Sequence, residues 1–217
     1  AEGIADLYVD MFGFTRPAVV RNCPAYEDLR AQDVAGGKVR LVHHGVAAAS
    51  RRLDLLLDAM ALLPEKYTLD LMLIGTEEKL GALKRYADRV GARVTFREPV
   101  KVVDIARALN DYDAEVIFYP PMTQNLKFAL PNKFFEAVQG RIAVITGESP
   151  EMAHIIRTFG NGAVVPGWTA TDLAAGIASI SSKELGAMKR SAEKAAQKLS
   201  AEHERDTFFA SIGLVHN

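Results

Sequence analysis

Residues 38–75 read KVRLVHHGVAAASRRLDLLLDAMALLPEKYTLDLMLIG, and this stretch decides the fold class. It holds an apolar strand pattern at 38–44, apolar residues at helical spacing over 51–63, and a second strand pattern at 69–74. A strand, a helix and a strand in succession are typical of a βαβ unit with parallel strands. Neither strand pattern alternates, as expected where helices cover both faces of a sheet.

The same alternation continues along the rest of the chain. We expect further strands at 93–96, 115–119, 142–146 and 163–166, and helices at 77–90, 102–109, 132–139, 150–159, 171–180 and 183–204. This pattern predicts an α/β fold, a doubly wound, Rossmann-like, six-stranded parallel sheet with strand order 3-2-1-4-5-6. Residues before 38 do not fit the repeat, although residues 4–12 favour an isolated helix.

The composition excludes several classes of protein. The 217 residues carry 26 Lys and Arg against 27 Asp and Glu, so no chain-wide basic surface for nucleic acid is expected. The single cysteine, Cys23, cannot form an intramolecular disulfide or a cysteine-rich zinc site. No apolar run approaches the roughly 18 residues that span a bilayer. We therefore expect a cytoplasmic protein with no metal and no nucleic-acid partner.

In such a sheet, ligands bind beyond the carboxyl ends of the strands, where the first and fourth strands are neighbours. The loops after those strands, at 45–50 and 120–132, are therefore the candidate binding loops. Gly45 ends the first strand, and the small residues after it would let a ligand approach the backbone. The second loop is long for such a connection, and long loops often carry function.

Basic residues follow the first loop. We expect Ser50 to cap the next helix, which places Arg51 and Arg52 in its first turn. Cations are disfavoured at that end of a helix unless an anion docks there. Alternatively, both arginines lie in water or pair with Asp54 or Glu65.

The second loop leads into a helix with a similar pattern. Asn132 is the expected cap, and Lys133 and Glu136 follow on one face of the helix. A lysine can bind a phosphate, and a carboxylate can accept hydrogen bonds from the vicinal diol of a ribose. The alternative is a surface ion pair between Lys133 and Glu136. Taken together, the two loops predict a site for a nucleoside diphosphate.

Other ligand motifs are missing or weak. The sequence has no G-x-G-x-x-G, no G-x-x-x-x-G-K-[ST] and no G-x-S-x-G. His43 and His44 end the first strand and are expected to be core or edge histidines, although His44 could donate to a phosphate.

At these residues the chain resembles the carboxyl-terminal half of the group 1 glycosyltransferases (glycosyltransferase family 4, GT-B fold). The matching segments span about residues 15–180 and include VRLVHHGVAAASRRLDLLLDAMALL, LDLMLIG, VTFREPV, LPNKFFEAVQGRIAVIT and GNGAVV. The resemblance implies that Glu136 holds the ribose of a sugar donor and that Arg51 contacts its diphosphate. It also implies that the backbone near Pro99 and Val100 touches the base.

Two positions depart from the family pattern. Val46 stands where the family often has an arginine, and Phe128 stands where it often has a glutamate that touches the donor sugar. The remaining candidates for binding the donor nucleotide are Gly45, Arg51, Val100, Asn132, Lys133 and Glu136, with Arg51 and Lys133 also expected to be catalytic.

The resemblance also implies an organisation and a reaction. Residues 1–30 would be a linker and a remnant helix of a missing amino-terminal acceptor domain, 31–182 the nucleotide-sugar-binding domain, and 183–217 a helical segment. The enzyme would transfer a sugar from a nucleoside diphosphate with retention of configuration, without a further cofactor. A nucleotide-sugar epimerase and a non-catalytic binding module are alternatives, and peripheral membrane association of the full enzyme is left open.

Overall fold

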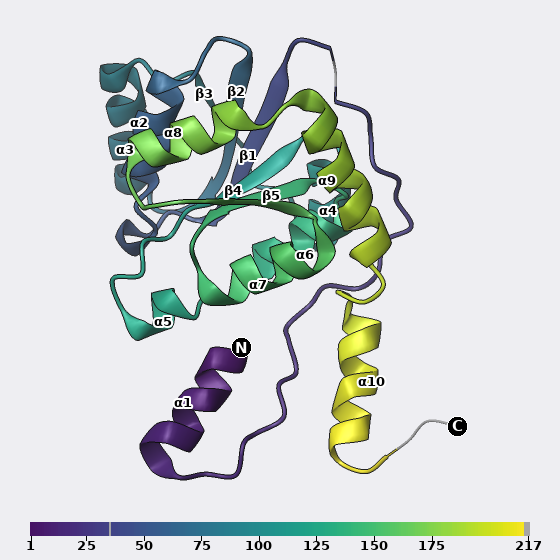
Figure 1. Ribbon diagram of the computed structural model, residues 1–217. Coiled ribbons are helices and arrows are strands. Elements are labelled where there is room, and N and C mark those ends of the chain that lie inside the picture. Colours follow the sequence, from purple (N-terminus) through teal and green to yellow (C-terminus); the bar gives the residue numbers. More distant parts are fainter. Residues whose placement is uncertain (35, 215–217) are drawn as a thin grey trace.

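The computed structural model describes residues 1–34 and 36–214. Its strands form one parallel sheet in the order β3-β2-β1-β4-β5-β6, which confirms the predicted fold class and strand order (Figure 1). The strands are β1 (Val39–Val46), β2 (Tyr67–Ile74), β3 (Val94–Arg97), β4 (Ala114–Ile117), β5 (Ala143–Gly147) and β6 (Gly162–Val165).

Helices cover both faces of this sheet (Figure 1). One face carries α2 (Leu53–Leu62), α3 (Glu77–Val90) and α8 (Ala170–Ser179), and the other carries α4 (Ile105–Leu109), α6 (Asn132–Gln139) and α7 (Pro150–Phe159). Helix α9 (Ser182–Ala195) contributes Leu185 to the apolar cluster of the first face and Ala195 to that of the second. Each layer encloses its own apolar cluster. Leu57 and Leu69 are fully buried in one cluster, and Phe134 and Ile117 in the other. Burial of both sheet faces explains why the strand sequences lack alternation.

The expected helix over 183–204 is wrong, because the structure divides it into α9 and α10 (Ala201–Ser211). The side-chain amide of Gln139 donates to the carbonyls of Ala196 and Leu199, at 2.8 and 3.0 Å. Ser200 then caps α10 by accepting a hydrogen bond from the His203 amide at 3.4 Å. These three bonds satisfy backbone groups that a continuous helix would satisfy itself, so the break is stabilised by side chains.

The amino-terminal region lies at the end of the molecule where α10 also lies. Helix α1 (Glu2–Phe12) rests on α7, and α1 and α10 both stand outside the sheet (Figure 1). The extended chain that follows α1 is held by Arg141, which donates to the carbonyls of Glu27 and Leu29. In residues 1–34 and 36–214, no helix has the length and apolar character to cross a membrane.

Candidate functional site

The loops that follow β1 and β4 meet at one point beyond the carboxyl ends of these strands. The guanidinium carbon of Arg51 lies 4.4 Å from the centroid of the Tyr119 ring, and Nζ of Lys133 lies 5.6 Å from the same centroid. Tyr119 follows β4, whereas Arg51 ends the short turn η1 (Ala49–Arg51) after β1. Two cations therefore share one aromatic ring, which is favourable because the ring face is electronegative.

Lys133 is held in a fixed position at the start of α6. Its ammonium donates to the carbonyl of His44 and lies 3.1 Å from Nε2 of His43. Nδ1 of His43 lies 2.7 Å from the carbonyl of Val116, which can only accept, so Nδ1 carries the hydrogen and Nε2 accepts from Lys133. Burial, followed by the nearby Lys133 charge, lowers the pKa of His43 well below its ordinary value. His43 is therefore a neutral partner of a charged lysine.

The burial of Lys133 also changes its own titration. Only 9 % of the residue is exposed. Desolvation lowers the pKa of Lys133 to about 8, and the Arg51 charge acts in the same direction. The carboxylates of Glu115 and Glu136 oppose this shift. Near neutral pH the ammonium is charged, and it is a strong partner for an anion because little water competes for it.

Glu136 lies on the same helix and faces His44. Its Oε2 is 2.8 Å from Nε2 of His44, and its side chain is 14 % exposed. On the other side of the imidazole, Nδ1 is 3.0 Å from Oε2 of Glu115, a fully buried carboxylate of β4. Glu136 is thus neither the surface ion-pair partner of Lys133 nor a core side chain. Within residues 1–34 and 36–214, no group of three His, Cys, Asp or Glu side chains is arranged to hold a metal ion.

Gly45 occupies a position that other residues would fill poorly. Its φ is +108°, and a Cβ atom built on it would lie 3.1 Å from Nζ of Lys133. The glycine therefore lets the ammonium lie directly against the end of β1.

An apolar cleft adjoins these polar groups. Its walls come from the ends of β1 and β2, from the segment between β3 and α4 and from α4 itself; they are His44, Gly45, Met72, Ile74, Pro99, Val100, Val102, Ile105 and Leu109. His44 lines the cleft and contacts Glu136, so one side chain separates the carboxylate from the cleft. An apolar slot beside a carboxylate and two cations can take a flat ring that is joined to a polar, anionic group.

Two expected caps are wrong. The residue that caps α2 is Arg52, not Ser50, because η1 comes between strand and helix and α2 begins at Leu53. Arg52 adopts a left-handed conformation with φ +48° and pairs with Asp54 at 2.7 Å, as the alternative interpretation proposed for it. Of these two arginines, Arg51 is the one that contacts the Tyr119 ring.

Asn132 is likewise not the cap of α6. The capping residue is Pro131, and Asn132 is the first helical residue. Its side-chain oxygen accepts a hydrogen bond from the amide of Asn22 at 3.0 Å. The side chain of Asn132 therefore holds the extended amino-terminal segment, a partner that lies far away in sequence.

Three residues that contribute to this site were not predicted as site residues from the sequence. Glu115 and Tyr119 were assigned only to a strand. His44 was expected at a core or edge position, with donation to a phosphate as the alternative. A charged residue inside the apolar stretch EVIFY was a usable signal, because buried carboxylates need a partner. Phe128, the other departure from the family pattern, packs against α1 at Gly3, where its ring leaves no room for a Cβ atom.

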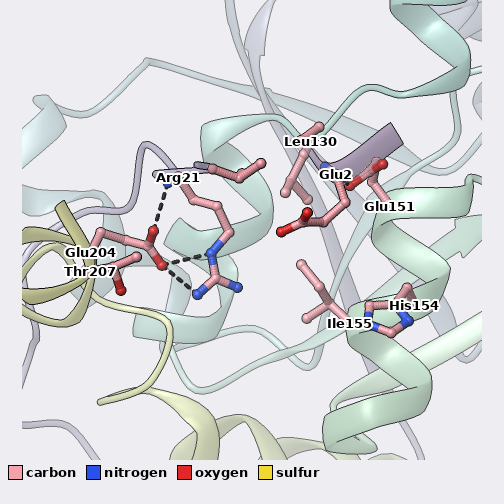
Figure 2. Close-up of a pocket in the computed structure, with 10 residues that line it drawn as sticks. Glu2, Arg21, Leu130, Glu151, His154, Ile155, Glu204 and Thr207 are labelled. Atoms are coloured by element: carbon pink, nitrogen blue, oxygen red, sulfur yellow. Dashed lines mark hydrogen bonds and ion pairs between the residues drawn. The ribbon is translucent and has the colours of Figure 1, made fainter. Parts of the chain in front are cut away.

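A second cavity of about 280 Å³ lies between α1, α7, α10 and the extended segment (Figure 2). Its carboxylates and Arg21 already have partners in the protein. Glu204 pairs with Arg21, and Glu151 accepts from the backbone amides of Glu2 and Gly3 at 3.0 and 2.7 Å. These contacts fasten the amino-terminal segment, and none of the predicted site residues lines the cavity.

Residues 26–199 match the family model for glycosyl transferases group 1. The chain belongs to the group 1 glycosyltransferase family. The match is to the group as a whole, so the narrower assignment to glycosyltransferase family 4 stays a prediction. No curated protein has a significant sequence match to the chain.

Solved structures with the same fold are glycosyltransferases of low sequence identity. The pneumococcal O-GlcNAc transferase GtfA, solved with UDP and GlcNAc, is 14% identical, with 100% of this chain and 44% of that chain covered at a TM-score of 0.68. HepE from Anabaena, solved with UDP and glucose, is 15% identical over 82% of this chain and 48% of its own, with a TM-score of 0.65.

A third neighbour consists of a single domain. The C-terminal domain of LpcC from Francisella tularensis is 16% identical over 82% of this chain and 96% of its own, with a TM-score of 0.62. These likenesses show a fold that matches one domain of GT-B glycosyltransferases. The group 1 glycosyltransferase chain described here spans about half the length of the first solved neighbours, 48% and 45%.

Proposed function

We propose that this chain is the donor-binding part of a glycosyltransferase that moves a sugar from a nucleoside diphosphate to an acceptor. The observation that carries the proposal is the convergence of Arg51 and Lys133 on the Tyr119 ring, with Glu136 and the apolar cleft beside them. Membership of the family supports the proposal, as do the two neighbours solved with UDP.

Each part of a donor then has a partner of matching chemistry. The base would enter the apolar cleft beside Gly45 and Val100. The ribose hydroxyls would donate to Glu136, and the diphosphate would bind Lys133 and Arg51. Positive charge at this point would stabilise the diphosphate as it departs, which is the catalytic contribution proposed for both cations. Asn132, at the first turn of α6, would contribute its backbone amide.

The remaining expectations belong to the whole enzyme. We propose that a region outside this chain binds the acceptor, that residues 1–30 join the two parts, and that residues 31–182 and 183–217 form the donor domain and a terminal helical segment. The transfer would be retaining and need no further cofactor. A cytoplasmic location and peripheral membrane contact also stay proposals.

Titration calorimetry with UDP, ADP and GDP, followed by their sugar derivatives, tests donor binding directly. At least one of these nucleotides should bind, and Glu136→Ala should weaken that binding about tenfold, the usual cost of losing hydrogen bonds to a charged group. Glu78→Ala, at an exposed position of α3, is the matched control and should leave the affinity unchanged. Equal affinities in the Glu136 variant and the parent would remove Glu136 from the site.

A further inference from the structure

The imidazole of His44 lies between two carboxylates that come from different elements. Its Nδ1 is 3.0 Å from Oε2 of Glu115 in β4, and its Nε2 is 2.8 Å from Oε2 of Glu136 in α6. The backbone amide of His44 also donates to Oε1 of Glu115, at 3.2 Å. Glu115 is fully buried, so its position is fixed, whereas Glu136 is 14 % exposed and bonds His44, which lines the apolar cleft.

The geometry fixes the protonation state of the ring. An ionised carboxylate only accepts hydrogen bonds, so each ring nitrogen must carry a hydrogen to bond both carboxylates. The ring is therefore an imidazolium. Although burial disfavours the charge, the Coulombic attraction of Glu115 and the hydrogen bonds to both carboxylates outweigh it and raise the pKa of His44 to about 9.

We infer that His44 is a positioning residue that sets the ribose selectivity of the site by holding the carboxylate of Glu136 in place. The inference rests on the proposed function, because it assigns a role to His44 in recognising the same donor. Oε2 of Glu136 is engaged by His44, and Oε1 is the oxygen that would accept a hydrogen bond from a ribose hydroxyl. A carboxylate that is already oriented loses little side-chain entropy when the ribose binds.

The positive charge of His44 also reduces the repulsion between Glu136 and a bound diphosphate. A carboxylate beside a diphosphate would repel it, since like charges at short range in a poorly solvated site are costly. The imidazolium between Glu136 and Glu115 offsets part of this negative charge while Lys133 and Arg51 stay available to the anion. The site can therefore use a carboxylate for the ribose without excluding the adjacent diphosphate.

The neighbouring histidine provides a matched control. His43 bonds Lys133 and the Val116 carbonyl, and it approaches Glu115 only to 3.8 Å. Replacing His43 should therefore disturb the lysine that binds the diphosphate and leave Glu136 in place. The two adjacent histidines are expected to affect different halves of the donor.

The experiment compares affinities for a ribonucleotide and its 2′-deoxy form, with the UDP, ADP and GDP pairs as probes. The parent chain should prefer the ribose form about tenfold, and Glu136→Ala should abolish that preference. His44→Phe alone would leave the buried carboxylate of Glu115 without its imidazolium partner. It is therefore combined with Glu115→Gln, which removes the carboxylate charge. The double variant should reduce the preference to less than about threefold, whereas His43→Phe should weaken both forms equally and keep the ratio.

Failure of the inference differs from failure of the proposed function. If Glu136→Ala abolishes the ribose preference but the double variant keeps it, His44 does not position Glu136. If the parent shows no preference, or Glu136→Ala keeps it, the ribose-binding role of Glu136 fails, and the inference fails with it. Nitrogen-15 spectra of the unaltered chain give a second readout. Both ring nitrogens of His44 should be protonated at pH 7, and a neutral ring would overturn the inference.

Discussion

Lys133 is a buried side chain that is proposed to bind an anion from solution. Its ammonium lies between the end of β1 and the Tyr119 ring, where the protein excludes most water. An ammonium in such a place binds anions strongly as long as it stays protonated. The same burial makes the charge sensitive to pH in a range where an ordinary lysine does not titrate.

Affinity for a nucleoside diphosphate should therefore fall as the pH rises above about 8. Burial lowers the pKa of Lys133 to about 8, so the charged form prevails below that pH and is lost above it. Calorimetry of the nucleotide that binds, between pH 6.5 and 8.5, measures the effect below the pKa of about 9 of His44. Lys133→Arg, which stays charged throughout, should flatten the profile, and an unchanged slope in this variant would contradict the assignment.

Arg51 and Lys133 both contact the ring of Tyr119, but the Tyr119 hydroxyl has no hydrogen-bond partner among the described residues. The side chain is 1 % exposed, and the phenol oxygen makes no hydrogen bond with the described part of the chain. Since a buried polar atom without a partner is destabilising, Tyr119→Phe should raise the free energy of unfolding by about 1 kcal/mol. Nucleotide affinity should change less than threefold, because the aromatic face remains. Denaturant unfolding checks the first value, and a loss of stability would show that the hydroxyl has a favourable role.

At the scale of elements, the site depends on how β1 ends. The strand pairs with β2 along its full length, from Val39 with Tyr67 to Val46 with Ile74, so its carboxyl end is held rigidly. Gly45 lies within this paired end and still adopts a positive φ, which leaves space for Lys133. The strand thus positions the ammonium of a residue that follows much later in sequence.

Gly45→Ala should weaken nucleotide binding as well as the fold. The new Cβ would meet the buried ammonium at 3.1 Å, and the positive φ of +108° adds strain of about 1–2 kcal/mol. Gly91→Ala is the control, because Gly91 also has a positive φ of +68° but nothing lies within 4 Å of its added Cβ. Both variants should lose stability, but only Gly45→Ala should lose affinity by tenfold or more. If both variants bound the nucleotide with equal affinity, the close approach of Lys133 to β1 would not be needed for binding.

At the scale of the whole molecule, buried polar pairs tie the final helices to the sheet. Lys189 of α9 is fully buried, donates to the carbonyl of Tyr112 at 2.8 Å and pairs with Asp113 at 3.1 Å. Asp113 also accepts from the backbone amide of Arg40 at 2.8 Å, next to the first residue of β1. The pair therefore connects α9 with the amino ends of β1 and β4, the two central strands.

Lys189→Met should destabilise the protein by about 3 kcal/mol, because it removes the closer of the two cations beside the buried carboxylate of Asp113 and leaves Arg40 at 3.6 Å. Adding Asp113→Asn should recover much of that loss, since the buried carboxylate charge is removed. Thermal and denaturant unfolding of both variants measure the free energies. A single variant as stable as the parent would mean that α9 is held by its apolar contacts alone.

The sequence was sufficient for the fold because its signals are local. Apolar spacing defined the strands and most helices, and α3, α6 and α7 begin and end where the periodicity predicted. The break between α9 and α10 could not be foreseen, because it is stabilised by Gln139, whose position relative to that segment is set by tertiary packing. The short helix α5 (Gln124–Lys127) was also missed, since four residues give no usable period.

For the site, the sequence by itself determined which loops would meet. Alternating strands and helices place the ends of β1 and β4 together, so the nomination of Arg51, Lys133 and Glu136 followed from chain order. Only the tertiary structure decided what those residues contact. Parallel pairing sets Val42 opposite Glu115, and this register brings a buried carboxylate to His44. A hydrogen bond requires two atoms to lie about 3 Å apart. Sequence periodicity predicts only which face of a helix or strand a residue occupies, so these contacts could be identified only in the folded structure.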